Sequence, residues 1–380
     1  GYDYADLQCQ TGAVWDGDVE VRNAAQLDDV AGYPVIGGEL VVNGTGLHDL
    51  EGLKCLEEVQ GRLYLVDNRK LEDLQGLRNL GRVGGYLRIE SNKTLLDLSG
   101  LGGLTSIGGY LRIDQNASLI TLDGLDGLTE VPDTVYVMGN PALRSLSGLD
   151  NVRTMAWIVY VMRNDSLASL EGLGSLESVE GDLIIKGNGS LTTLAGADSL
   201  DRVGGNVTLG GNGGLTDLDG LQSLRVVEGA LAIGTPVEQD GSLVEVTGFQ
   251  PNHSYTSLRG LDGLESVGAL GLYELHVLTD LDGLGSLTDV GKLTLDYCNA
   301  LGSLDGLTNL RDAGVTEISG CHGLPAPQGT GDLTAIPDGP PVHPHPAPPP
   351  LLPLAHPTPS QPPPPIPTHP TLPPPPPAPL

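Results

Sequence analysis

Hydrophobic residues recur along the chain with a fixed period. Leucine, isoleucine or valine fills two alternating positions once in every 24 residues, as at Leu87 and Ile89. Alternation of apolar and polar residues over a short run is typical of a strand with one buried face. The period holds from Gln60 to Glu228, and similar units of 23 residues follow one insertion. Repetition at this spacing predicts a solenoid in which each unit forms one turn.

Between these strands, apolar residues recur at every third position, for example at Leu95, Leu98 and Leu101. That spacing suits a helix, but a glycine in the middle of the segment costs a helix about 1 kcal/mol each time. We therefore expect bends and short strands, and predict an all-β, single-stranded β-helix of about 13 turns over residues 16–324. The glycines are Gly100, Gly124, Gly148, Gly172, Gly196 and Gly220.

The rest of the chain divides around this β-solenoid. Residues 1–15 are expected to cap its N-terminal end, residues 325–339 to form a linker, and residues 340–380 to form a proline-rich tail. Proline fixes φ and cannot enter a sheet interior, so the tail is predicted to adopt polyproline II. One turn is lengthened by an inserted loop at about 234–257. Such a loop is either a contact site or a tolerated surface feature.

One column of the repeat holds asparagine in seven successive turns. Stacked asparagines can hydrogen-bond to their copies, so we predict a structural ladder along one corner of the solenoid. Its members are Asn68, Asn92, Asn116, Asn140, Asn164, Asn188 and Asn212.

The four cysteines lie at the two ends of the repeat region. Cys298 and Cys321 fall in the asparagine column, one turn apart. Layers about 4.8 Å apart fit the Cα spacing of a disulfide, so this spacing predicts a bond. Cys9 and Cys55 flank the first turns and are expected to form a second bond, which implies an oxidising compartment. Free structural cysteines are the alternative.

Seven asparagines lie in N-glycosylation sequons. Glycans are expected at Asn43, Asn206 and Asn252. The other four sequons belong to the asparagine column, where a glycan fits only if that corner points outward. We leave both orientations open for these, and favour glycosylation less at Asn92, Asn116, Asn164 and Asn188.

The outward side of the main strand is rich in large apolar and aromatic residues. A contiguous patch of this kind suggests a partner-binding face, and tyrosine suits both sugars and polyproline ridges. Cross-strand tyrosines that only stabilise the sheet are the alternative. Arginines 62, 88 and 112 lie nearby. The predicted face comprises Tyr64, Tyr86, Tyr110, Tyr136, Tyr160, Ile158, Met138, Met162 and Ile184.

Charge and composition restrict the classes of function. The chain has 48 acidic and 19 basic residues, a net charge of -29, which disfavours binding to nucleic acid or anionic membranes. No apolar run is long enough to span a bilayer, and the first residues lack a signal-peptide pattern. No histidine or cysteine nucleophile arrangement occurs and the carboxylates are dispersed, so we predict no catalytic residues, no cofactor and no metal site. Weak calcium binding is left open.

The segment "GYLRIDQNASLITLDGLDGLTEV", residues 109–131, resembles the repeat of receptor L domains. This resemblance implies a right-handed β-helix, located outside the cell, whose faces bind a ligand. Leucine-rich repeats are the alternative, although their corner reads Leu-x-x-Asn-x-Leu where this chain has Asn-x-x-Leu. The matching residues are Gly109, Leu111, Ile113, Asn116, Leu119, Leu122, Gly124, Leu125 and Leu128.

The proline blocks of the tail resemble the hydroxyproline-rich glycoproteins of plant and algal walls, which implies hydroxylated and glycosylated prolines. A long tail and a tyrosine-rich sheet to receive it suggest head-to-tail assembly. We therefore expect a secreted structural glycoprotein, not an enzyme, that self-assembles into an open filament in a cell wall or surface layer. The alternative is an extracellular recognition module that binds a peptide or glycan on the same face.

Overall fold

The computed structural model describes residues 4–234, 254–311 and 313–324. Most of the inserted loop, the whole linker and the proline-rich tail, with Asn252 and the predicted polyproline II conformation, lie outside the described residues.

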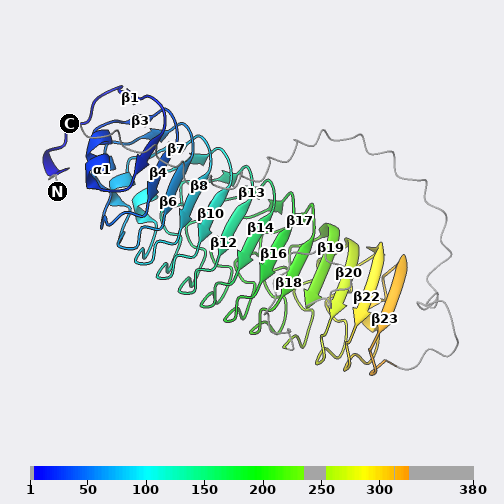
Figure 1. The fold of residues 1–380 in the computed structure, drawn as a ribbon. Coiled ribbons are helices and arrows are strands. Elements are labelled where there is room, and N and C mark those ends of the chain that lie inside the picture. Colours follow the sequence, from blue (N-terminus) through cyan, green and yellow to red (C-terminus); the bar gives the residue numbers. More distant parts are fainter. Residues whose placement is uncertain (1–3, 235–253, 312, 325–380) are drawn as a thin grey trace, which may run out of the picture. The chain divides into compact units, whose positions relative to one another are not determined.

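The described residues form a parallel β-solenoid, in which the main strand of each turn pairs with its equivalent in the next turn (Figure 1). Register is maintained from layer to layer, so that Leu87 lies opposite Leu111, which in turn lies opposite Val135. The predicted fold is confirmed, with about 12 complete turns between the first and last of thirteen main strands. These are β2 (Val19–Val21), β4 (Leu40–Asn43), β6 (Leu63–Val66), β8 (Leu87–Glu90), β10 (Leu111–Asp114), β12 (Val135–Met138), β14 (Val159–Met162), β16 (Leu183–Lys186), β18 (Val207–Gly210), β19 (Val226–Gly234), β20 (Ser266–Tyr273), β22 (Lys292–Asp296) and β23 (Val315–Ser319).

A second side of the solenoid consists of two-residue strands that precede the main strands. In β19 and β20 the two elements join into one longer strand, with an irregularity between Val227 and Ala230. The separate short strands are β1 (Val14–Trp15), β3 (Val35–Ile36), β5 (Glu58–Val59), β7 (Arg82–Val83), β9 (Ser106–Ile107), β11 (Glu130–Val131), β13 (Thr154–Met155), β15 (Ser178–Val179), β17 (Arg202–Val203) and β21 (Asp289–Val290).

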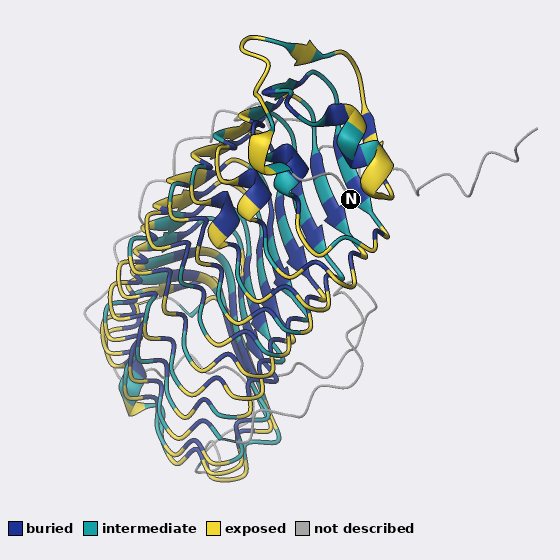
Figure 2. Cartoon of the chain, turned by 90° about the vertical axis from the view of Figure 1, so that its left-hand side faces the viewer, coloured by how far each residue is buried: buried dark blue, intermediate teal, exposed yellow. Residues whose placement is uncertain are grey.

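The third side contains turns and short 3-10 helices. The 3-10 helices are η2 (Glu51–Leu53), η3 (Gln75–Leu77), η4 (Ser99–Leu101) and η5 (Asp305–Leu307), and η1 (Tyr4–Asp6) lies near the N-terminus. Leucines from this side and the inward residues of both strands form one continuous core, and most are fully buried. In Figure 2 the buried parts of successive coils line up.

One α-helix closes the N-terminal end of the stack. Helix α1 (Ala24–Val30) buries Leu27 and Val30, and its N-cap Asn23 accepts a hydrogen bond from the Gln26 N–H. This helix was not predicted, because its seven residues interrupt the repeat pattern without establishing one of their own. It falls within the segment expected to be solenoid, just beyond the predicted cap.

The insertion leaves the stack unbroken. Leu231 in β19 pairs with Leu270 in β20, so the strands on either side of the inserted loop are direct neighbours. At Ser254, the first described residue after the loop, the hydroxyl donates to the Leu215 carbonyl at 2.7 Å. The next residue, Tyr255, is fully buried. The chain therefore rejoins the core at once.

The recurring glycine marks a close approach between layers. A Cβ atom on Gly148 would lie 2.1 Å from the Leu122 carbonyl oxygen of the preceding layer, and the φ of Gly148 is 110°. No other residue type fits that space, and few tolerate that backbone conformation. The prediction that this segment is not an α-helix is confirmed, but the glycines are required mainly by contact between layers.

The cysteines confirm one of the two predicted disulfides. Cys9 and Cys55 are bonded, with their Cα atoms 5.4 Å apart. The predicted Cys298–Cys321 disulfide is wrong for this structure, because both side chains are free thiols. Their register is as expected, since β22 and β23 pair Leu295 with Ile318, three residues before each cysteine.

The Cys298 thiol takes the place of an asparagine amide in the column, whereas the Cys321 thiol bonds within its own turn. The Cys298 thiol donates to the Leu272 carbonyl at 3.7 Å, and the Cys321 thiol donates to the Ser319 carbonyl at 3.4 Å. Burial raises the pKa of Cys298 to about 12 and raises that of Cys321 as well. Both groups therefore stay protonated and react slowly.

Counting thiols tests this assignment. After alkylation of denatured, unreduced protein, mass spectrometry is expected to find adducts on Cys298 and Cys321 and none on Cys9 or Cys55. Reduction before alkylation serves as the control and should label all four residues. A chain in which no cysteine is alkylated before reduction would show that Cys298 and Cys321 form a second disulfide.

Substitution of a column glycine tests the contact between layers. Gly148→Ala is expected to lower the free energy of unfolding by about 3 kcal/mol, because the methyl group meets the Leu122 backbone at an unfavourable φ. Gly174→Ala is the matched control, since a Cβ there meets nothing within 4 Å. Denaturant unfolding measures both, and equal midpoints would contradict the assigned contact.

Candidate binding face

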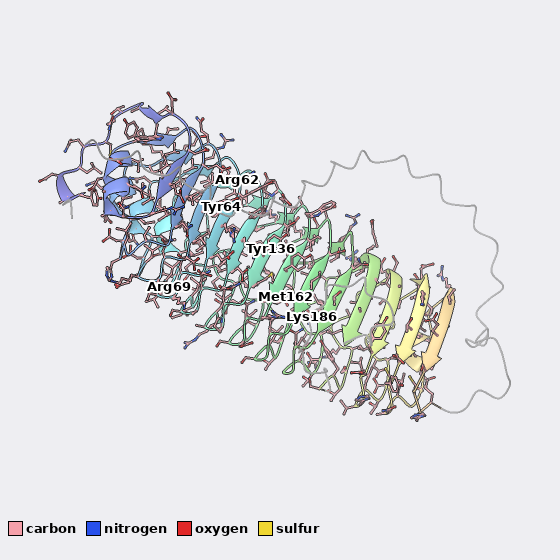
Figure 3. The ribbon with its side chains drawn as sticks, viewed as in Figure 1. Arg62, Tyr64, Arg69, Tyr136, Met162 and Lys186 are labelled. Carbon is pink, nitrogen blue, oxygen red and sulfur yellow. A yellow bond between two sulfur atoms is a disulfide. The ribbon has the colours of Figure 1, made fainter. Side chains whose placement is uncertain are left out.

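A patch of outward aromatic side chains lies on β6, β12 and β14 and at the residues just before β8 and β10. It forms the main part of the predicted partner-binding face and is here called the tyrosine face. Its aromatic residues are Tyr64, Tyr86, Tyr110, Tyr136 and Tyr160, all half-buried. Figure 3 labels Tyr64 and Tyr136 on the main-strand side of the solenoid, with Arg62 beside Tyr64. The structure thus places the five predicted tyrosines on one surface.

The tyrosines form two stacks joined at a right angle. The rings of Tyr86 and Tyr110 stack with centroids 4.1 Å apart, and those of Tyr136 and Tyr160 stack at 5.1 Å. Tyr110 meets Tyr136 edge to face at 6.0 Å. Each stack joins equivalent positions in adjacent layers, so the stacking also stabilises the sheet.

Three arginines lie over tyrosine rings of this face. The Arg62 guanidinium lies 5.0 Å from the centroid of the Tyr86 ring, and the Arg112 guanidinium lies 5.5 Å from that of Tyr136. Arg88 lies over Tyr64 at 5.8 Å. These contacts are attractive because the ring face carries the negative part of the aromatic quadrupole.

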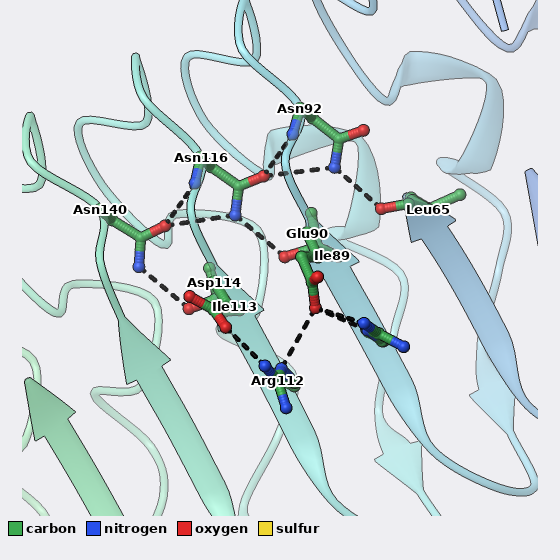
Figure 4. A network of polar contacts seen from close by, with 10 residues as sticks. Leu65, Ile89, Glu90, Asn92, Arg112, Ile113, Asp114, Asn116 and Asn140 are labelled. Atoms are coloured by element: carbon green, nitrogen blue, oxygen red, sulfur yellow. Dashed lines mark hydrogen bonds and ion pairs between the residues drawn. The ribbon is translucent and has the colours of Figure 1, made fainter. Parts of the chain in front are cut away.

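Carboxylates pair with all three arginines. Arg88 and Arg112 share Glu90, at 2.6 Å and 3.3 Å, and Arg112 also reaches Asp114 at 2.6 Å (Figure 4). Arg62 pairs with Glu39 at 3.2 Å. These carboxylates were not among the predicted site residues. The signal is the pattern Arg-Ile-Glu and Arg-Ile-Asp, which puts arginine and acid on the same side of one strand.

Burial sets the protonation of this network. It raises the pKa of the Tyr110 hydroxyl, and a hydrogen bond with Tyr64 raises it further. Burial also raises the pKa of Tyr160 and of the Asp114 carboxyl. Burial opposes the Arg112 cation, but its hydrogen bond to Asp114 and the nearby negative charges outweigh this and raise the pKa of Arg112. Tyr110 and Tyr160 therefore remain protonated at ordinary pH.

The aliphatic members of the predicted face differ in exposure. Ile158, Met138 and Ile184 are half-buried, but Met162 is only 5% exposed, so its assignment to the solvent-exposed surface is wrong. Met162 lies in register between Met138 and Lys186 in adjacent layers, which limits its exposure.

The asparagine ladder runs along the corner that follows each main strand. The side-chain oxygen of Asn116 accepts two hydrogen bonds from Asn92, one from the backbone N–H at 3.0 Å and one from the side-chain amide at 3.2 Å. The Asn116 amide donates to the Ile89 carbonyl at 2.9 Å and to Asn140 at 3.2 Å (Figure 4). The predicted ladder is confirmed, and its seven asparagines are fully buried.

The first rung of the ladder is not an asparagine. Thr45 donates from its backbone N–H and its hydroxyl to the Asn68 side-chain oxygen, at 3.1 Å and 2.8 Å. The side-chain amide of each of the seven asparagines also donates to a main-strand carbonyl of an earlier layer, as that of Asn68 does to the Val42 carbonyl. The corner therefore leaves few polar groups unsatisfied.

The ladder decides four of the glycosylation predictions. The prediction of glycans is wrong for four asparagines, because their side chains are buried and hydrogen-bonded within the solenoid: Asn92, Asn116, Asn164 and Asn188. Glycans at Asn43 and Asn206 stay predictions. Asn43 is half-buried, whereas Asn206 is exposed and donates to Asp182 at 3.0 Å.

Within the described ranges, no three or more histidine, cysteine, aspartate or glutamate side chains come together in a way that could hold a metal ion. No helix in the described part of the chain is long and apolar enough to cross a membrane.

Comparison with known proteins gives distant structural matches only. No family model and no curated protein matches the sequence. The chain is similar to an internalin from Listeria monocytogenes, with 18% identity, coverage of 78% of this chain and 88% of that one, and a TM-score of 0.25. It is also similar to TLR13 in a complex with ssRNA13, with 15% identity, coverage of 77% and 57%, and a TM-score of 0.16. Any inference about the function of this chain therefore depends on its own residues.

Removal of one rung tests the ladder. Asn140→Ala takes the acceptor from the Asn116 backbone and side-chain amides, and we expect a loss of about 3 kcal/mol in the free energy of unfolding. Asn151→Ala is the matched control, since Asn151 is exposed and makes one side-chain bond to Asp126. Thermal and denaturant unfolding compare the two. Similar losses in both variants would show that the ladder contributes no more than a surface contact.

Proposed function

We propose that this protein is an extracellular structural glycoprotein that assembles with copies of itself. The proline-rich residues 340–380 of one copy dock on the tyrosine face of the next. The two surfaces differ, so the contact need not close into a ring and can propagate into an open filament. The observation that carries this proposal is the tyrosine face, an aromatic patch over five neighbouring layers in which the rings of four layers are stacked in pairs.

Charge supports this choice of docking surfaces. A net charge of -29 opposes association of two copies over most of their surface. On the tyrosine face, Arg62, Arg88 and Arg112 are paired with Glu39, Glu90 and Asp114. Residues 340–380 contain no aspartate, glutamate, lysine or arginine. Docking of this segment on this face therefore avoids like-charge repulsion.

The Cys9–Cys55 disulfide supports an oxidising location such as the cell exterior. The exposed sequon at Asn206 is compatible with a glycan there. The tail resembles wall glycoproteins only in composition, so hydroxylation of its prolines is part of the proposal.

A recognition module is the second candidate. The tyrosine face occupies the layers from β6 to β14 and not the whole solenoid, which suits one short peptide or glycan. Such a module would be monomeric at micromolar concentration, and sedimentation velocity separates the two candidates.

Deletion of residues 340–380 tests assembly. The full chain is expected to form filaments visible by negative-stain microscopy, and the deleted chain to sediment as a monomer. A chain with an equally long Gly/Ser segment in place of residues 340–380 controls for length and should also stay monomeric. Tyr110→Ala with Tyr136→Ala tests the receiving face and should shorten the filaments. Filaments of unchanged length without residues 340–380 would refute the proposed function.

A further inference from the structure

The tyrosine face has a defined length along the solenoid axis. Tyr64, Arg88, Arg112, Tyr136 and Tyr160 are register partners in five successive layers. Layers of a parallel sheet are about 4.8 Å apart, so the column from Tyr64 to Tyr160 spans about 19 Å. A ligand lying along the axis meets this length of surface.

A polyproline II helix has a repeat that matches the layers. It has three residues per turn and rises about 3.1 Å per residue, so one turn spans about 9.3 Å, close to the 9.6 Å of two layers. A segment lying along the axis therefore presents the same ridge to every second layer. About six residues, or two turns, cover the tyrosine face.

The chemistry of the face favours a ligand rich in hydrogen-bond acceptors. Tyr110 stacks on the Tyr86 ring and Arg62 also lies over that ring, and Tyr160 and Arg112 make the same two kinds of contact with Tyr136. A ligand therefore meets ring edges, which carry partial positive charge, and tyrosine hydroxyl groups that can donate hydrogen bonds. Proline offers a carbonyl acceptor and no N–H, so it matches this surface.

We infer that the tyrosine face is a register-matched site for a polyproline II segment about six residues long, lying along the solenoid axis. The inference rests on the proposed function and names the segment that docks. Two blocks of the chain have the required length and composition, Pro362–Pro367 (PPPPIP) and Pro373–Pro379 (PPPPPAP). Both lie outside the described residues, and a second copy of the chain supplies them.

Peptide length provides the test. Fluorescence anisotropy would measure binding of labelled peptides of three, six, nine and twelve prolines to the full chain, kept below the concentration at which it assembles. Affinity is expected to rise at least about tenfold from three to six prolines, and by less than about twofold from nine to twelve. A Gly/Ser peptide of six residues is the control and should bind no better than three prolines.

Single hydroxyl removals locate the site. Tyr136→Phe is expected to weaken binding of the six-proline peptide severalfold while leaving the fold intact. Tyr297→Phe is the matched control, because Tyr297 is exposed and lies outside the tyrosine face. Three results would overturn the inference. They are equal affinity for the peptides of three and six prolines, an affinity that keeps rising in proportion to peptide length, and unchanged affinity in the Tyr136→Phe variant.

The outcomes separate the inference from the proposed function. If affinity shows no rise from three to six prolines but the filaments depend on residues 340–380, the register-matched site is refuted and the proposed assembly is not. Filaments that form without those residues would remove the proposed function, whatever the peptides do.

Discussion

The contact of each residue with its own counterpart one layer away is the constraint on which this solenoid depends. At about 4.8 Å, only certain residues can be repeated in a column. Apolar side chains pack on their copies inside, and the closest approach admits glycine alone, as at Gly148. At the buried corner the copies must hydrogen-bond to one another. Asparagine meets this need because its amide has both donors and an acceptor, whereas a carboxylate or an ammonium would face its own charge.

The ladder also fixes the backbone at the end of each strand. The residue before a ladder asparagine has a positive φ, as in Asp67, Ser91, Gln115 and Arg163, at 55° to 59°. Residues other than glycine are strained by about 1 kcal/mol in this conformation. The hydrogen bonds of the following asparagine offset that strain and hold the corner. Each strand therefore ends at the same point as its neighbour, and the outward side chains stay in register.

Periodic features were predictable from the sequence, and features that occur once were not. The apolar columns, the asparagine column and the alignment of Cys298 with Cys321 follow from counting residues, because a fixed period places equivalents together. Helix α1 breaks the period and left no such signal. The thiols show a different limit, since register puts Cys298 in the right layer but does not determine its rotamer. A thiol that donates to the Leu272 carbonyl serves the corner as an amide does.

The same constraint accounts for the composition of the tyrosine face. Aromatic rings can repeat in adjacent layers because they stack, as Tyr136 does on Tyr160. Arginines in adjacent layers repel each other unless a carboxylate lies between them, and Arg88 and Arg112, which are direct register partners, share Glu90. The requirement to stabilise the stack thus produces a surface that is rigid and locally charge-compensated. A ligand on such a surface gains little by adapting its shape, and its affinity depends on whether its own repeat is commensurate with the layers.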